Sequence, residues 1–227
     1  MKKAIFSSIL SLVVLVFLAS CGGSKTNDKN KDTKDSVKTL KTIDNLKSAI
    51  NGETTASAKY KAFSEKAKAE GYNQIAGLFA ATSKSESIHA ANHMKALEKM
   101  GEKYEAKADS FDVKTTKENL EAAIKGESYE ADTMYPDFIK TADADQATDA
   151  KKSFNWAMET EKKHKELYQK ALEALKNKKV KDLPMEYFVC PKCGNTFTAD
   201  DVDEICGFCG TPQSKYIGIS WKDVNRK

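Results

Sequence analysis

Apolar residues recur at helical spacing through the middle of the chain. Between residues 39 and 177 they form stripes among Lys and Glu, and a single proline interrupts this stretch. Gly71 and Gly101 mark two helix ends, and Thr115-Thr116-Lys117-Glu118 is a capping-box pattern that marks a helix start. The pattern predicts four helices, at about residues 39–70, 73–100, 115–141 and 145–177.

The connections between these helices differ in length. Helices one and two, and helices three and four, are joined by a few residues, which makes them antiparallel neighbours. The connection 101–114 can stretch to roughly 45 Å, whereas a helix of about 27 residues is roughly 40 Å long. It can therefore cross the full length of a bundle. We expect an all-α four-helix bundle with one long crossover, which is the ferritin-like arrangement.

The two helical hairpins repeat a pattern of glutamate and histidine. The sequence "AINGE" at 49–53 matches "AIKGE" at 123–127 with an offset of 74 residues. The sequence "ESIH" at 86–89 matches "EKKH" at 161–164 with an offset of 75 residues. Residues three apart on a helix face the same way. Each Glu-x-x-His pair can therefore ligate one metal centre from one helix.

Two such pairs, with one glutamate from each remaining helix, form the ligand set of a di-iron carboxylate site inside a bundle. A single Glu-x-x-His arises easily in a helix rich in Lys and Glu, so one pair alone is weak support. Two pairs in register favour a metal site, because burying such a cluster would be prohibitive without compensating cations. The candidate ligands are Glu53, Glu86, His89, Glu127, Glu161 and His164.

One further carboxylate breaks the symmetry of the two halves. Glu130 follows Glu127 by three residues, whereas the equivalent position of the first half is Ala56. An extra ligand on one side suggests that one iron exchanges ligands, with Glu130 suited to ferric iron and His89 to ferrous iron. The alternative is that Glu130 is a solvated helix residue. His93 is expected to have a surface or structural role, with a place behind the ligands as the alternative.

Four of the five cysteines lie near the C-terminus as two C-x-x-C pairs, each followed by glycine, at Gly194 and Gly210. Such a glycine can adopt positive φ and turn backbone amides toward sulfur. Four thiolates placed in this way form a tetrahedral site for zinc or iron, and the spacing alone does not choose between them. Disulfides are a further alternative in an exported protein. The candidate ligands are Cys190, Cys193, Cys206 and Cys209.

The N-terminus is typical of an export signal. Lys2 and Lys3 precede an apolar run to Leu18, which is shorter than the roughly 20 residues of a membrane span. "LASC" at 18–21 resembles the lipobox of bacterial lipoproteins, which implies cleavage before Cys21 and a lipid on that residue. The alternative is an ordinary signal peptide with a free cysteine. We expect an exported protein, lipid-anchored to a bacterial membrane on its periplasmic or cell-surface side.

The overall charge excludes one class of partner. Charged residues make up 31% of the chain, but the formal net charge is only +4. This balance is too mild to indicate nucleic acid as a partner. The interspersed Lys and Glu are instead typical of solvated helix faces.

Four stretches together resemble the rubrerythrin family. They are "GETTASAKY", "ESIHA", "KGESYEADTMYPDF" and "ETEKKHKELY", and the resemblance covers about residues 39–219. It implies that Glu130 joins the six bundle ligands at a di-iron centre, and that the four cysteines bind one iron in a rubredoxin-like domain. It also matches Tyr60 and Tyr135 to the family's active-site tyrosines, for which simple packing is the alternative. Gly207 is a departure, because many rubredoxin knuckles have proline there.

The resemblance also implies a function. A non-haem di-iron peroxidase would reduce hydrogen peroxide to water, with electrons supplied through the cysteine-bound iron by an external donor. The residues expected to take part are Glu130, His89, Tyr60 and Tyr135. A homodimer or higher homo-oligomer is implied, with the tail of one subunit against the bundle of another. Rubrerythrin-like proteins are mostly cytoplasmic, so an exported one needs a reductant outside the cytoplasm.

Two other classes of protein remain open. An iron-handling ferroxidase or storage protein would share the bundle but would not need the electron input of a cysteine domain. A membrane-bound scaffold would carry zinc in the tail and have no turnover. The expected organisation is a signal peptide (1–20), a flexible tether (21–38), a ferritin-like di-iron domain (39–177), a linker (178–185), a rubredoxin-like domain (186–219) and a tail (220–227).

Overall fold

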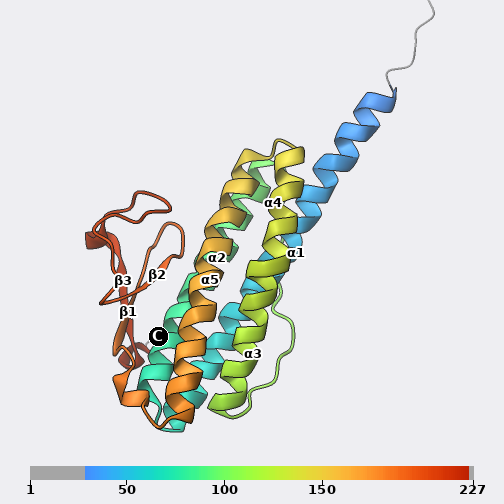
Figure 1. Cartoon of the computed structure of the whole chain (residues 1–227). Coiled ribbons are helices and arrows are strands. Elements are labelled where there is room, and N and C mark those ends of the chain that lie inside the picture. The colour runs from blue at the N-terminus through green and yellow to red at the C-terminus, as the bar shows by residue number, and fades with distance from the viewer. Residues whose placement is uncertain (1–28, 225–227) are drawn as a thin grey trace, which may run out of the picture.

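The structure is a computed structural model that describes the backbone of residues 29–224 and the side chains of residues 41–224. The expected signal peptide, Cys21 and the last three residues lie outside these ranges. The bundle helices are α1 (Lys29–Ala69), α2 (Asn73–Lys99), α3 (Thr116–Tyr129), α4 (Tyr135–Ala144) and α5 (Thr148–Lys176) (Figure 1). With a small C-terminal sheet beside them, they confirm the predicted fold class. No helix within the described residues is long and apolar enough to cross a membrane.

The first helix begins earlier than the apolar pattern predicts. It starts at Lys29, so residues 29–38, which we expected to be part of the tether, have helical backbone. Figure 1 shows this end of α1 projecting beyond the other helices. Apolar periodicity detects only the part of a helix that has a packed face, so a polar extension leaves no such signal.

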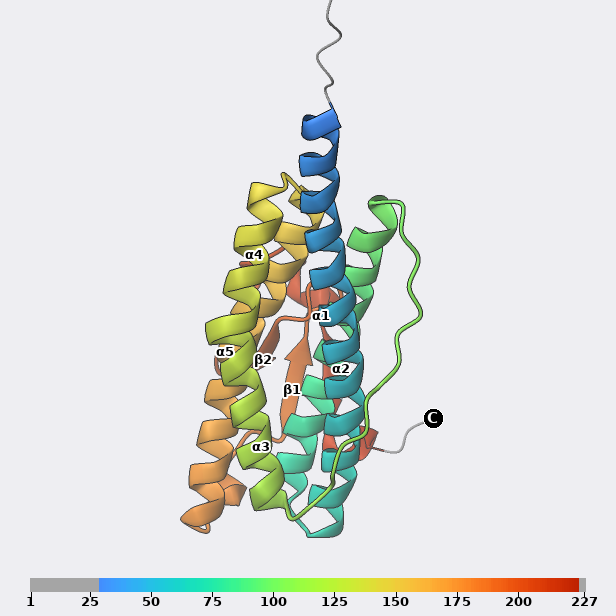
Figure 2. The same cartoon turned by 90° about the vertical axis from the view of Figure 1, so that its right-hand side faces the viewer.

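The long crossover spans the bundle as predicted. It leaves the end of α2, runs beside α1 and reaches the start of α3 (Figure 2). It is attached to α1 by Lys47, whose Nζ lies 3.2 Å from a Glu102 oxygen, and by Asn51, whose Nδ2 donates to the Tyr104 hydroxyl at 2.5 Å. The crossover ends at the predicted capping box on Thr115.

The third helical segment is interrupted, whereas the sequence predicts a continuous helix to about residue 141. A π-helix, Glu130–Met134, lies between α3 and α4. Pro136 follows in the first turn of α4, and it has no N–H to bond the carbonyl of residue 132. A wider turn accommodates this missing bond and inserts one extra residue into the helix.

The tail forms a three-stranded antiparallel sheet of β1 (Glu186–Val189), β2 (Thr196–Thr198) and β3 (Ile217–Ser220), in the order β2-β1-β3. Tyr187, Val189 and Ile219 join a hydrophobic core to which α1, α2, α3 and α5 contribute. A Cβ at Gly77 of α2 would lie 3.3 Å from the backbone nitrogen of Trp221. Glycine there permits the close approach. The tail thus packs on the bundle of its own chain, whereas the resemblance implies a contact between subunits.

Gly77→Val should weaken this docking. The added side chain meets backbone, and overpacking of this kind costs about 1–3 kcal/mol. We therefore expect limited proteolysis in segment 177–185 to become roughly an order of magnitude faster. Ala91→Val is the control, because it also introduces a valine into α2, but at an exposed position. Equal cleavage rates for the two variants would mean that Gly77 does not determine the docking.

Candidate metal centres

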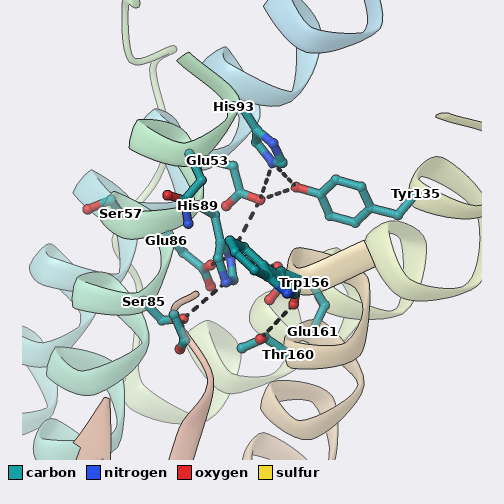
Figure 3. A network of polar contacts seen from close by, with 12 residues as sticks. Glu53, Ser57, Ser85, Glu86, His89, His93, Tyr135, Trp156, Thr160 and Glu161 are labelled. Carbon is teal, nitrogen blue, oxygen red and sulfur yellow. Dashed lines mark hydrogen bonds and ion pairs between the residues drawn. The ribbon is translucent and has the colours of Figure 1, made fainter. Parts of the chain in front are cut away.

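Three helices bring the first group of donors together. Glu53 comes from α1, Glu86 and His89 from α2, and Glu161 from α5, and all four are buried. His89 Nδ1 lies 2.9 Å from Glu86 Oε2 and 2.9 Å from Glu161 Oε1. Figure 3 shows these side chains converging from their separate helices. The four donors converge on one point, as the ligands of a metal site do.

A second group lies beside the first and shares two of its members. His164 of α5 and Glu127 of α3 join Glu86 and Glu161. His164 Nδ1 lies 2.9 Å from Glu161 Oε2 and 3.1 Å from Glu86 Oε1. Glu86 and Glu161 therefore each turn one oxygen toward His89 and the other toward His164. Two carboxylates shared in this way are placed to bridge two metal ions.

The donors fit a metal pair because they lack other partners. Both oxygens of Glu86 and of Glu161 and the Nδ1 atoms of both histidines are buried without a hydrogen bond. Burial alone would lower the pKa of His89, but Glu161, Glu53 and Glu86 raise it well above its usual value. The cluster therefore favours positive charge at the positions where metal cations would sit. Burying these carboxylates without cations would be prohibitive.

Burial and neighbouring charges also shift the pKa values of the carboxylates. Burial and the neighbouring charge of Glu86 raise the pKa of Glu127 to about 8. Burial also acts to raise the pKa of Glu53, but the His89 and His93 rings, with nitrogens 3.7 and 3.8 Å from its Oε1, bring it below its usual value. The site can therefore hold some carboxylates charged only beside a cation.

The tail lies directly behind both histidines. His164 Nε2 is 2.9 Å from Thr196 Oγ1, and His89 Nε2 is 3.5 Å from Ser85 Oγ. Ser85 in turn donates to the Gly194 carbonyl at 2.6 Å. A Cβ at Gly194, where φ is +87°, would lie 2.4 Å from His89 Nε2. These contacts orient the two rings so that each Nδ1 faces the site.

Glu130 lies near the site but outside both groups of donors. It is half-buried at the start of the π-helix, and its Oε1 would lie 4.0 Å from a Cβ on Gly52. Burial, followed by the charges of Glu53 and Glu127, raises its pKa well above the usual value. A neutral carboxyl held beside the donors is placed to join them when it loses its proton.

The two tyrosines reach across the bundle to the opposite half. The Tyr60 hydroxyl of α1 donates to Glu127 Oε1 at 2.5 Å, and the Tyr135 hydroxyl of α4 donates to Glu53 Oε1. Tyr60 follows Glu53 by seven residues, whereas Tyr135 follows Glu127 by eight. The extra residue of the π-helix keeps the second tyrosine in the equivalent place. Both hydroxyls are buried, and burial raises both pKa values well above the usual range, so they stay protonated donors.

His93 is fully buried, so of the expected surface or structural role the surface position is wrong. Its Nε2 lies 3.1 Å from the Tyr135 hydroxyl, and its Nδ1 lies 2.7 Å from Ser153 Oγ. The spacing of four residues from His89 placed it on the buried face, and this signal was available in the sequence. Ser85 lies at the same spacing on the other side of His89, whereas Ser153 and Thr196 carry no such signal, because their roles depend on contacts between distant segments.

The four cysteines form a second donor set in the tail. Their sulfurs lie within 4.8 Å of one another, and all four are free thiols. The Cys190–Cys209 and Cys193–Cys206 sulfur pairs are 3.5 Å apart, far beyond the roughly 2 Å of a disulfide. The sequence alternative of disulfides is therefore wrong here. Gly194 and Gly210 have the predicted positive φ, and Trp156 of α5 donates to the Phe208 carbonyl at 3.0 Å, which ties the second knuckle to the bundle.

Comparisons with known proteins agree with this geometry. The rubrerythrin family model matches residues 44–172. Rubrerythrin-2 of Clostridium acetobutylicum is 36% identical over 182 residues, which are 80% of this chain and 98% of that protein. Nigerythrin of Nitratidesulfovibrio vulgaris is 35% identical over 183 residues, covering 77% of this chain and 85% of that protein. A solved structure of nigerythrin in a mixed-valence state superposes with a TM-score of 0.70 at 34% identity, over 78% of this chain and 86% of that chain.

The extent of these matches decides the family and the cofactors. They span the bundle, and the solved nigerythrin shares its arrangement. The bundle offers the donors of a carboxylate-bridged di-iron centre, and the tail offers the four cysteines of a mononuclear iron site. This chain belongs to the rubrerythrin family.

Proposed function

We propose that the protein is a non-haem di-iron peroxidase that reduces hydrogen peroxide to water and protects against oxidative stress. The observation that carries the proposal is the contact between the two donor sets. Gly194, which follows Cys193 directly, packs against the His89 ring within one chain. A one-electron site beside a two-metal site suits a reaction in which electrons arrive singly and are used in pairs.

When bound, the irons supply the two electrons that cleave the O–O bond, and the cysteine-bound iron replaces them. The protein supplies the rest. Glu86 and Glu161 would hold the two irons together from two sides. Tyr60 and Tyr135 hold Glu127 and Glu53, respectively, with protonated hydroxyls. Glu130 is the spare carboxylate on the side of Glu53. We infer that it exchanges with His89 as a ligand during turnover.

The proposal includes partners that lie beyond this chain. An external reductant must supply electrons to the tail, and we propose a homo-oligomer. We also propose that the protein is exported and anchored to a bacterial membrane by lipid on Cys21, with residues 22–28 following the anchor. The reductant must then act outside the cytoplasm.

Metal analysis and an anaerobic peroxide assay together test the activity. We expect three irons per chain and hydrogen peroxide consumption that continues while an electron donor is present. Cys206→Ser, which removes one ligand of the tail site, should keep the bundle irons but stop sustained consumption. Oxidation of added ferrous iron with iron accumulation would instead support the ferroxidase alternative. Zinc in the tail with no turnover would support the scaffold.

Glu130→Ala tests the ligand exchange. Loss of the spare carboxylate should slow peroxide turnover by about tenfold or more, the scale on which supporting groups affect metal sites. Iron should stay bound, because Glu130 belongs to neither donor group. Glu121→Ala, at an exposed position of α3, is the control. Turnover as fast as in the control would remove the argument for exchange.

Cys21→Ala tests the anchor. Loss of the lipidated thiol should move the protein from the membrane fraction to the soluble fraction after cell lysis, because a diacyl anchor is the stable attachment expected at this position. Immunoblots of the two fractions measure the change. Continued retention in the membrane fraction would count against the lipobox.

A further inference from the structure

One buried group has no part in the metal sites themselves. His93 is the one histidine of the three that belongs to neither donor group, and it lies one turn beyond His89 on α2. It is packed between the rings of Phe154 and Tyr135, with centroids at 5.2 and 5.8 Å. Both of its nitrogens have a polar partner, and Figure 3 shows the contact with Tyr135. A buried imidazole with both nitrogens engaged has a fixed orientation.

The hydrogen bonds of His93 run in one direction. The Tyr135 hydroxyl donates to Glu53 Oε1, so its oxygen is left to accept from His93 Nε2–H at 3.1 Å. His93 Nδ1 is then the acceptor and receives the Ser153 hydroxyl at 2.7 Å. Each donor in this series of hydrogen bonds, from Ser153 through His93 to Tyr135, therefore points toward Glu53, the candidate metal ligand.

This series of hydrogen bonds determines which oxygen of Glu53 is free. Oε1 accepts from Tyr135, whereas Oε2 is buried without any hydrogen bond. A tyrosine hydroxyl can rotate, but the hydrogen bond from His93 leaves Tyr135 only one favourable direction, toward Glu53. Glu53 Oε1 also lies 3.7 Å from His89 Nδ1, but it is already engaged by Tyr135, so Oε2 is the oxygen left without a hydrogen bond.

The other half of the site lacks this support. Tyr60 donates to Glu127 in the same way, but the position equivalent to His93 is Tyr168. The Tyr168 hydroxyl pairs with Thr82. Among the described residues, no hydrogen bond is donated to the Tyr60 oxygen. Glu53, on the side where Glu130 lies, is therefore held more firmly than Glu127.

We propose that Ser153, His93 and Tyr135 are positioning residues that fix Glu53 as a one-oxygen ligand of one metal of the pair. Ser153 donates to Nδ1 and so supports the tautomer of His93 that is protonated at Nε2, His93 sets the direction of the Tyr135 hydroxyl, and the hydroxyl holds Glu53. The proposal rests on the proposed di-iron function only for its role in turnover. Held in this way, Glu53 stays in place while His89 and Glu130 exchange.

The tautomer of His93 is the first test. The full-length chain, ¹⁵N-labelled at histidine and loaded with zinc as a diamagnetic probe, has only three imidazoles to assign by NMR. We expect the His93 signals of a neutral ring protonated at Nε2 and unprotonated at Nδ1. A ring protonated at Nδ1 would reverse the hydrogen bonds and overturn the proposal.

An isosteric pair of variants is the second test. Ser153 borders a surface cleft of about 170 Å³, so a slightly larger side chain has room. Ser153→Thr keeps the hydroxyl, and Ser153→Val has the same shape without it. Titration of ferrous iron against a chelator should show one of the two bundle metals bound about tenfold more weakly in the Val variant. The Thr variant should bind both metals as the wild type does.

A third variant keeps the outcome decisive. Tyr135→Phe removes only the hydroxyl at the other end of this series of hydrogen bonds. It should weaken the binding of the same metal. Equal affinities in the Thr and Val variants, or an unchanged affinity in Tyr135→Phe, would overturn the proposal. These readouts need no turnover. If the wild-type protein failed to consume peroxide, the proposed function would fail, while the tautomer and the affinities would still decide the role of His93.

Discussion

The structure depends on the burial of four carboxylates and two imidazoles in one core. Glu53, Glu86, Glu127 and Glu161 are almost completely buried, together with His89 and His164. Without cations, such a cluster would cost more than the roughly 5–15 kcal/mol that separate folded from unfolded chains. The raised histidine pKa values show the same demand, because protons are held where metals would bind. The free energy of packing the four helices therefore depends on metal binding.

The rest of the fold serves this cluster. The crossover lets two similar hairpins face each other, so that each contributes one Glu-x-x-His pair and one outer glutamate. The tail closes the side where the ring nitrogens face away from the site, through Thr196 and the Ser85–Gly194 contact. Glycines at positions 77 and 194 permit this closeness. A domain that brings electrons thereby also helps to hold the ligands.

The sequence predicted those features that are local or repeated. The six bundle donors were identified because two repeats place them at equivalent positions, and the capping box at Thr115 is a short-range signal. Other features depend on tertiary contacts that no local pattern encodes. Ser153 and Thr196 are ordinary polar residues until α2 or α5 packs against them. The π-helix leaves only a weak trace in the sequence, the change of offset between the two halves from 74 to 75 residues. The polar first residues of α1 have no apolar face, so they leave no such trace in the sequence.

The most direct measurement is anomalous diffraction at the iron edge from crystals of the iron-loaded, full-length protein. The account predicts two iron peaks between Glu86 and Glu161, roughly 3.5–4 Å apart, with Nδ1 of His89 facing one and Nδ1 of His164 facing the other. A third peak should lie among the four cysteine sulfurs. A single peak in the bundle, or histidine rings turned to solvent, would contradict the account.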